Sequence, residues 1–510
     1  MALDSLPLFL AISVLVATAY FSASLCRRKD DHYPPGPGTR SSIGNVALIP
    51  PKKPWVTFTE WGKRYGPLVH LKVPGQHFYF VNSNKVADQL LEKRSRIYSS
   101  RAFANALDLA GWSFLLPAMA YSDSWRANRR LHHQSLKSQS IPQFYPAIEE
   151  KVYAFLRSLL NHPEEFMDNT EVLSGGAVLG TMFGLDVTNV DSRALQLSKT
   201  AIRAVDTVVS PQFVFSATYF PFFRFLPIWF PVLGRLKEDL VNSLTSLKDM
   251  KELVVEHTMK LLKEGDLKSS LVAELLEVNK VNGGSIEEDD RIVNMGLISY
   301  AAGADTMVSS VWTFFLAMIR HPRCQEKAQM EIDSVIGTNR LPTFADRSSL
   351  PYVNAIYWEV MRWHPPLPLA PHATIEDDFY DGFYIPKGSV VFGNIWGMTR
   401  DEAVYEKPDE FIPERYYDKV NDYRDDVAFG FGRRICVGRY FAEAVVWLTI
   451  ATVLAAFRLE KAKNEQGEEI DTPESYSEGP VLFSRPLPFR CSITPRSDKS
   501  TGLIEAFSNF

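Results

Sequence analysis

The sequence predicts a mainly α-helical fold with small β-sheets, built as one large domain behind an N-terminal transmembrane helix. Long segments carry apolar residues at three- and four-residue spacing, which is typical of helices, and a few short segments bounded by Gly, Pro and Asn have the composition of strands. The 510 residues are 46% hydrophobic and 23% charged, which favours a folded protein with a large core. The net charge of -5 gives no electrostatic reason to expect a nucleic-acid partner.

The predicted membrane anchor comes first in the chain. Residues 6–25, LPLFLAISVLVATAYFSASL, contain no charge and are long enough to span a bilayer. The basic run Arg27–Lys29 follows, and the positive-inside rule then leaves the rest of the chain in the cytoplasm. A cleaved signal peptide is the alternative, but it needs basic residues before its apolar stretch. We expect an anchor over 1–26, a basic and proline-rich hinge over 27–50, and a single domain over 51–510.

Helices and strands follow from the hydrophobic pattern of the domain. Helical spacing is clearest in residues 152–160, 240–264 and 292–320. Strand-like patterns occur in residues 67–73, 77–82 and 389–396. We therefore expect the helices to form most of the core, with a small sheet beside them.

The glycine-rich loop FGFGRRICVG, residues 429–438, is the strongest chemical signal. It holds Cys436 and leads into a helical pattern over 439–457, so a thiolate would lie beside a helix N-terminus, where N–H groups stabilise negative sulfur. A lone cysteine is more often a small buried apolar side chain, which is our interpretation of the other three. A dinucleotide fingerprint is a weak alternative, because Ile435 stands where its third glycine belongs.

This loop resembles the cysteine signature of the cytochrome P-450 family. The match rests on Phe429, Gly432, Arg434, Cys436 and Gly438. The resemblance implies a cytochrome P-450 fold in which Cys436 binds the iron of haem b. Phe429, Arg434 and Gly438 are then expected to contact the cofactor.

Four further motifs match the same family in order along the chain. They imply haem contacts for Trp125, Arg129, Ala302 and His372, catalytic proton transfer for Asp305 and Thr306, and a structural salt-bridge cluster of Glu359, Arg362 and Arg415. Tyr416 replaces the commoner phenylalanine of the motif that holds Arg415. Taken alone, small residues around Thr306 also fit close helix packing, with the threonine bonded back to its own helix. Glu359 and Arg362 alone also fit an exposed ion pair.

The family resemblance implies a haem-thiolate monooxygenase that inserts one oxygen atom from O2 into a lipophilic small molecule, by hydroxylation or epoxidation. The chain shows no flavin or nicotinamide motif of its own, so we expect electrons from a separate NADPH-cytochrome P-450 reductase that carries FAD and FMN. The basic stretch from Arg126 to His133 is the expected docking surface. The implied location is the endoplasmic reticulum membrane, single-pass, with the catalytic domain on the cytoplasmic face. The chain also resembles fungal microsomal members that oxidise secondary metabolites.

Apolar segments indicate where the substrate enters and binds. Residues 213–230 hold nine aromatics and one charge, Arg224, which predicts an apolar cover that dips into membrane lipid; an ordinary buried hairpin is the alternative. The residues expected in the substrate pocket are Phe114, Ile298, Leu369 and Leu482. Two other functions stay open: an isomerase or dehydratase of the same fold that needs no redox partner, and a non-catalytic haem sensor.

Overall fold

The fold is seen in a computed structural model, which describes residues 32–38, 45, 48–73, 75–102, 111–208, 234–266, 269–417, 427–478 and 483–506. The expected anchor over 1–26 and the expected apolar cover over 213–230 lie outside these residues.

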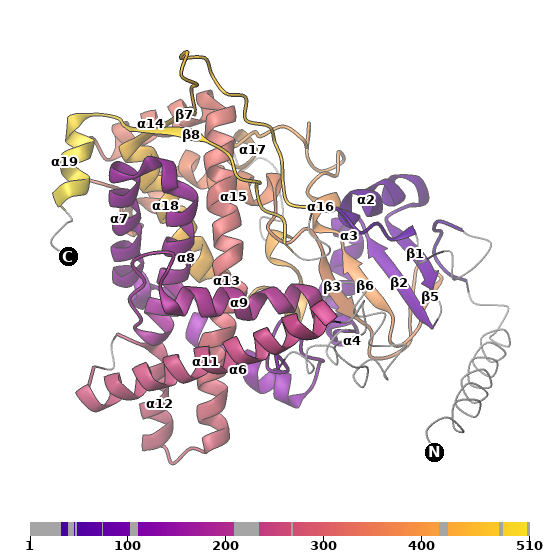
Figure 1. The fold of residues 1–510 in the computed structure, drawn as a ribbon. Helices are drawn as coiled ribbons and strands as arrows, with labels where there is room; N and C mark the ends of the chain where they lie inside the picture. The colour runs from indigo at the N-terminus through magenta and orange to yellow at the C-terminus, as the bar shows by residue number, and fades with distance from the viewer. Residues whose placement is uncertain are drawn as a thin grey trace.

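Helices make up most of the protein. In chain order they are α2 (Pro54–Tyr65), α3 (Asn84–Ala87), α4 (Ser95–Tyr98), α6 (Asp123–Leu136), α7 (Tyr145–Asn161), α8 (Phe166–Phe183), α9 (Arg193–Val208), α11 (Gly234–Glu264), α12 (Leu271–Val281), α13 (Ile286–Arg320), α14 (Pro322–Val335), α15 (Pro351–Trp363), α16 (Ile395–Met398), α17 (Glu414–Tyr417), α18 (Arg439–Ala456) and α19 (Asp498–Ala506). The long ones from α7 to α15 and α18 gather on one side of the protein, with the main sheet and the helices α2, α3, α4 and α16 on the other side (Figure 1).

The main sheet has four strands in the order β1-β2-β6-β3. The strands are β1 (Leu68–Val73), β2 (Gln76–Val81), β6 (Val390–Gly393) and β3 (Ala370–Ala373). β2 and β6 run parallel, and the other pairs are antiparallel. Two small hairpins add β4 (Asp378–Tyr380) with β5 (Phe383–Ile385), and β7 (Phe457–Lys461) with β8 (Cys491–Pro495). This sheet brings residues near position 80 beside residues near 390, far apart in the sequence.

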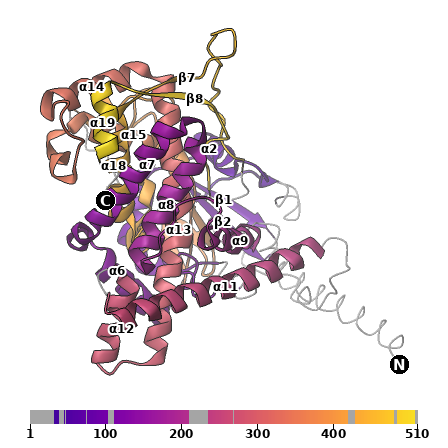
Figure 2. The same cartoon turned by 60° about the vertical axis from the view of Figure 1, so that its left-hand side comes forward.

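α13 runs through the middle of the helical side, as both views show (Figures 1 and 2). Its N-terminus is fixed by Ser285, whose hydroxyl accepts the N–H of Glu288 at 3.2 Å, and acidic residues fill its first turn. From Ile292 onward most of its side chains are buried, against α8 and α18 among others. Among the described residues, α13 and α18 are long and apolar enough to cross a membrane, but both are mostly buried in the protein, as core helices are.

The mainly α-helical fold with small sheets is confirmed. The helical patterns over 152–160, 240–264 and 292–320 lie within α7, α11 and α13. The strand expected over 389–396 is shorter, because Asn394 ends it: its side chain accepts the N–H of Gly397 at 3.2 Å and begins the short helix α16. A side-chain cap thus interrupts an apolar pattern that alone favoured a strand.

Candidate active site

The cysteine loop is a tight turn held by its own backbone and by a neighbouring helix. The N–H of Cys436 donates to the carbonyl of Phe429 at 2.8 Å, and α18 begins directly after Gly438. Gly432 has a φ of +54°, and a Cβ there would lie 2.2 Å from the carbonyl oxygen of Leu91. A larger residue at position 432 would therefore collide with the backbone of Leu91. At Gly438, in contrast, nothing lies within 4 Å of an added Cβ.

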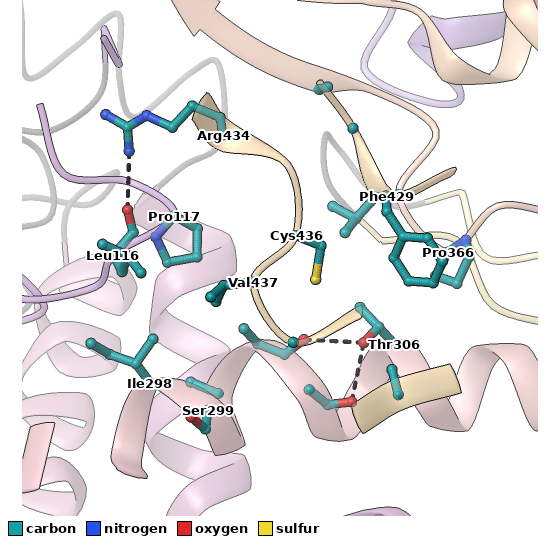
Figure 3. A pocket seen from close by; sticks show the side chains of 18 of the residues that line it. Leu116, Pro117, Ile298, Ser299, Thr306, Pro366, Phe429, Arg434, Cys436 and Val437 are labelled. Atoms are coloured by element: carbon teal, nitrogen blue, oxygen red, sulfur yellow. Dashed lines mark hydrogen bonds between the residues drawn. The ribbon is translucent and has the colours of Figure 1, made fainter. Parts of the chain in front are cut away.

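The Cys436 thiol faces an internal cavity of about 330 Å³. Its side chain is exposed, and it borders that cavity. Ala302 and Thr306 of α13 line the opposite wall, and Figure 3 shows the sulfur pointing toward this helix. Burial raises the pKa of Cys436, while the N–H of Gly438 and nearby arginines lower it. The thiolate form of Cys436 would therefore be stabilised by a metal cation bound to the sulfur.

A rim of positive charge surrounds one side of the cavity. Arg101, Arg129 and Arg434 all line it, and among the described residues no aspartate or glutamate does. Burial and the neighbouring guanidinium groups lower the pKa of Arg434 to about 7, and burial lowers that of Arg101 to about 9. Buried cations without an acidic partner are costly, so this rim is suited to an anionic ligand.

Some polar groups of the rim are bonded to the backbone, and one has no protein partner among the described residues. Arg434 donates to three backbone carbonyls, of Ser99, Leu116 and Met119, and its guanidinium lies 4.1 Å from the Trp125 ring. The indole N–H of Trp125 is buried and has no hydrogen-bond partner among the described residues. His372 also lines the cavity, and its Nδ1 donates to the carbonyl of Tyr98 at 2.9 Å. Burial, together with Arg101, lowers the pKa of His372 well below its usual value, which keeps the ring neutral.

Asp305 and Thr306 are neighbours on α13 but differ in their surroundings. Thr306 lines the cavity, and its hydroxyl lies 3.1 Å from both the Ala302 and the Gly303 carbonyl (Figure 3). The back-bonded threonine that helix geometry allowed is thus present. Asp305 is not among the cavity-lining residues; burial raises its pKa, and the exposed Arg485 partly opposes that rise.

Comparison with known proteins identifies the architecture around this cavity. The family model for cytochrome P450 matches residues 34–487. The chain belongs to the cytochrome P450 family. It is 38% identical over 508 residues to cytochrome P450 monooxygenase ple1 of Rhodocybe pseudopiperita, covering 98% of this chain and 96% of that relative. It is 34% identical to monooxygenase COX1 of Coprinopsis cinerea, covering 97% of this chain and 98% of the relative.

Solved structures show the same P450 fold. A zebra fish cytochrome P450 solved with progesterone has a TM-score of 0.70 at 22% identity, covering 87% of this chain and 99% of its own. The haem domain of cytochrome P450DA has a TM-score of 0.76 at 18% identity, covering 92% of this chain and 99% of its own. The enzyme class is therefore monooxygenase, and members of the family bind haem b.

The cavity of this P450 fits haem. A soft sulfur donor, Cys436, faces the apolar space, and the arginine rim with the unpartnered Trp125 N–H matches the two carboxylates at the edge of the porphyrin. Arg101, Trp125, Arg129, His372 and Arg434 would hold those carboxylates. Phe429, Ala302 and Gly438 line the same cavity, where they would contact the macrocycle.

The predicted salt-bridge cluster of the P450 motifs is present and lies in the protein interior. Arg362 donates to both carboxylate oxygens of Glu359 at 2.7 Å, and both residues are almost fully buried. Arg415 Nε lies 3.5 Å from the same carboxylate. Arg362 also donates to the carbonyls of Thr399, Pro408 and Glu410 at 2.6 to 3.0 Å. The pair is therefore a buried junction and not the exposed pair that the sequence alone allowed.

The residues expected in the substrate pocket fall into three groups. Ile298 and Leu369 line the cavity. Phe114 does not; its ring stacks on that of Trp112, with centroids 5.5 Å apart. Leu482 lies outside the described residues, and the next residue, Phe483, lines the cavity instead.

Sequence reasoning missed Arg101 as part of the rim. It stands in the segment SSRAF, which matches no motif used above, and it reaches the cavity only because Ser99 and Ser100 bridge to Ala373 beside the main sheet. Arg101 directly follows the two bridging serines, and since that bridge forms only in the folded chain, the sequence offered no signal that would have marked this arginine.

We expect Arg101→Gln to weaken haem retention in this P450 by about tenfold, because a charged hydrogen bond to an anionic group is lost. Transfer of haem to apomyoglobin, followed by absorbance, measures the rate of haem loss. Arg96→Gln is the control, since Arg96 is exposed and pairs with Glu376 at the surface. Equal haem loss from both variants would show that Arg101 does not hold the cofactor.

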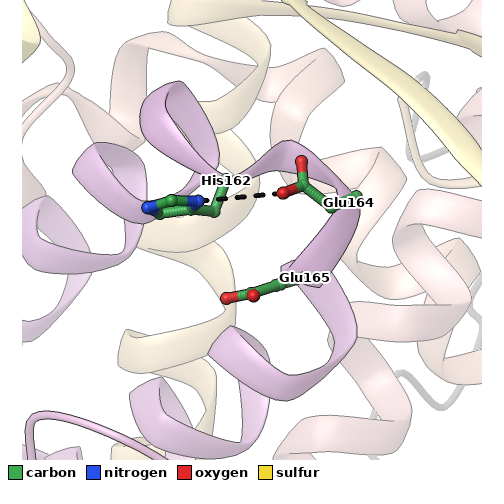
Figure 4. A group of neighbouring side chains, drawn as sticks. All are labelled: His162, Glu164 and Glu165. Carbon is green, nitrogen blue, oxygen red and sulfur yellow. Dashed lines mark ion pairs between the residues drawn. The ribbon is translucent and has the colours of Figure 1, made fainter.

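One other group of metal-ligating side chains occurs among the described residues, at the start of α8. It consists of His162, Glu164 and Glu165, all exposed (Figure 4). His162 Nδ1 lies 3.7 Å from a Glu164 oxygen. Exposed acidic groups at a helix start are common without a metal, and we assign no site there.

Proposed function

We propose that this P450 hydroxylates or epoxidises an uncharged, lipophilic small molecule in fungal secondary metabolism, with electrons from an NADPH-cytochrome P450 reductase. The observation that carries the proposal is the cavity between Cys436 and α13, whose walls are mostly apolar and whose only charged lining groups are the arginines of the rim, within the described residues. A neutral substrate needs no counter-charge in such a pocket. The fungal relatives support the proposed context.

The protein's own residues would prepare the reaction in three ways. Haem, when bound, activates O2 and supplies the oxygen atom that enters the substrate. Cys436 would donate sulfur electron density to the iron, and apolar residues such as Ile298 and Leu369 would exclude water and orient the substrate. Thr306 would hold a proton at its hydroxyl beside the reacting space. Asp305, whose pKa burial raises and which does not line the cavity, would replenish that proton.

We expect Thr306→Val to uncouple the enzyme: NADPH consumption continues, product per NADPH falls by about tenfold or more, and hydrogen peroxide accumulates. The reason is that the hydroxyl beside Ala302 and Gly303 is the polar group that α13 offers to the cavity at this turn. Product, NADPH and peroxide are measured together. Thr306→Ser keeps the hydroxyl and should restore most coupling. Wild-type coupling in the valine variant would exclude a role for Thr306 in proton delivery.

The proposed reductase surface lies on the outer face of α6. Arg126, Arg130, His133 and Lys137 are exposed and follow one another at helical spacing, whereas Arg129 and His132 of the same basic stretch point inward and line the cavity. Arg433 of the cysteine loop is exposed too and donates to Tyr121, at the start of α6. These exposed basic residues therefore lie next to the loop that carries Cys436. An acidic partner bound there would have a short path for electrons to the haem iron.

We expect the pair Arg130→Glu and Arg433→Glu to slow reduction of the enzyme by about 10- to 100-fold at low salt, because charge complementarity sets the association rate. Stopped-flow reduction under carbon monoxide measures this rate at several salt concentrations. Arg458→Glu, an exposed arginine of β7, is the control. If the control slows reduction as much as the pair does, the docking surface is elsewhere.

A membrane location is part of the proposal. It rests on the uncharged segment 6–25, the basic run after it, and the apolar segment 213–230. We propose a single-pass protein of the endoplasmic reticulum with its catalytic domain in the cytoplasm. Fractionation of fungal cells should place the full chain in microsomes, with the domain open to added protease. A lumenal domain would contradict this topology.

A substrate screen tests the function itself. The purified holoenzyme is titrated with terpenoids, polyketides, indoles and fatty acids, and binding is followed by the spin-state change that accompanies loss of water from the iron. Compounds that bind are then turned over with reductase and NADPH, and products are identified by mass spectrometry. Product that gains one oxygen atom only when NADPH and reductase are present supports the proposal. Product formed without them would favour the isomerase or dehydratase alternative, and binding without any product would favour a sensor.

A further inference from the structure

The C-terminal hairpin brings an aromatic side chain to the cavity from a distant part of the chain. Tyr476 bridges to Pro486, and the N–H groups of Ser477 and Leu487 donate across the hairpin at 2.7 and 2.8 Å. Phe483 lies on this hairpin and lines the cavity together with Pro366 and Thr306. Its position relative to α13 therefore depends on what holds the hairpin.

A first clamp fixes the residue next to Phe483. Ser484 is 2% exposed, and its carbonyl accepts the Ser309 hydroxyl at 2.7 Å while its N–H donates to the Pro366 carbonyl at 2.9 Å. Ser309 lies on α13 one turn after Thr306. The hairpin is thus tied to the helix turn that faces Cys436.

A second clamp holds the base of the hairpin. The Tyr476 ring stacks on the His364 ring, with centroids 3.5 Å apart and planes 6° from parallel, and its hydroxyl reaches Thr313 of α13 at 3.3 Å. His364 Nε2 lies 2.8 Å from a Glu474 oxygen. Burial, with Arg400 and Arg362, lowers the pKa of His364 well below its usual value, so the ring is neutral and its N–H donates to the carboxylate.

We propose that Ser309 and the His364–Glu474 pair are positioning residues that hold Phe483 as a specificity-determining wall of the cavity. Losing either clamp frees the ring and loosens the fit of any bulky ligand that contacts it. A small ligand that binds only at the haem iron does not sense the change. The inference rests on the proposed function in one respect, that this cavity takes the substrate.

Two probes that bind the haem iron separate these effects in the holoenzyme. Imidazole binds through its ring nitrogen alone, and 1-phenylimidazole adds a phenyl group that reaches the cavity wall. We expect Ser309→Ala to weaken the binding of 1-phenylimidazole by about 3- to 10-fold, a change of the size that one buried hydrogen bond contributes. The affinity for imidazole should stay unchanged. Glu474→Ala should act in the same direction, and Glu474→Gln, which keeps an acceptor oxygen for His364, should restore most of the affinity.

A double-mutant cycle with Phe483→Ala shows whether the clamp acts through that ring. In the Phe483→Ala background, Ser309→Ala should have no further effect on 1-phenylimidazole. Thr170→Ala, which removes a buried hydroxyl bonded within α8, controls for general loosening. An undiminished effect in the Phe483→Ala background, or an equal effect on both probes, overturns the inference. Failure of the proposed function would appear separately, as a holoenzyme that discriminates the probes yet forms no product with reductase and NADPH.

Discussion

Cys436→Ser is expected to abolish monooxygenase activity, lowering turnover by more than about a thousandfold. The serine hydroxyl has nearly the same size but stays protonated where burial already raises the pKa of a thiol, so it cannot supply the electron-rich ligand that favours O–O cleavage. The substitution changes a single atom of the cavity wall and leaves the backbone contacts of Arg434 in place, so the variant should still fold and retain some haem. Its reduced carbon monoxide complex should lose the far red-shifted Soret band of thiolate-bound haem.

The matched control is Cys491, a partly buried cysteine. Cys491 lies on β8, and burial raises its pKa to about 12, so it is a neutral thiol away from the cavity. Cys491→Ser should keep the red-shifted band and full turnover. Persistence of the band in Cys436→Ser would mean that another residue ligates the iron, and every assignment that depends on this loop would then fail.

The parts of the site that lie close together in sequence were predictable. In the cysteine loop the sulfur, the close-packed Gly432 and the following helix are all within ten residues, and backbone bonds such as Cys436 to Phe429 define the turn. α13 was predictable for the same reason, since its periodicity alone places Ala302 and Thr306 on one face. The family motifs then indicated that this face of α13 lies opposite the cysteine loop.

The parts that depend on tertiary contacts were not. Phe114 belongs to an apolar stretch, and only its stacking on Trp112 directs it away from the cavity. Phe483 reaches the cavity beside Ser484, whose carbonyl accepts a hydrogen bond from Ser309, 175 positions earlier than Ser484. The position of Arg101 likewise depends on the bridge to β3, and the orientation of His132 depends on how α6 packs. The hydrophobic pattern predicts that such residues are buried, but it does not predict which residues they pack against.

Glu359→Ala is expected to have the largest effect on stability, about 3 to 5 kcal/mol, because it leaves the Arg362 guanidinium buried without its carboxylate. That loss is a large fraction of the 5 to 15 kcal/mol that typically separates folded from unfolded protein. Glu359 also accepts the N–H of Ile412 at 2.7 Å, so the segment that leads to Arg415 loses a contact as well. We expect little soluble holoenzyme, with a much lower midpoint of thermal unfolding.

The pair Glu277 and Lys280 provides the matched control for this prediction. Its residues have the same i, i+3 spacing on a helix, but Lys280 is 78% exposed and the two charges lie 3.5 Å apart at the surface of α12. Solvent screens such a pair, and Glu277→Ala should cost less than about 1 kcal/mol. The two pairs therefore share their sequence spacing, while the buried pair is also the closer one, with 2.7 Å between its charged groups instead of 3.5 Å. If Glu359→Ala unfolded at the same temperature as Glu277→Ala, water would have to reach Arg362. The buried pair would then not be what holds α15 to the segment before the cysteine loop.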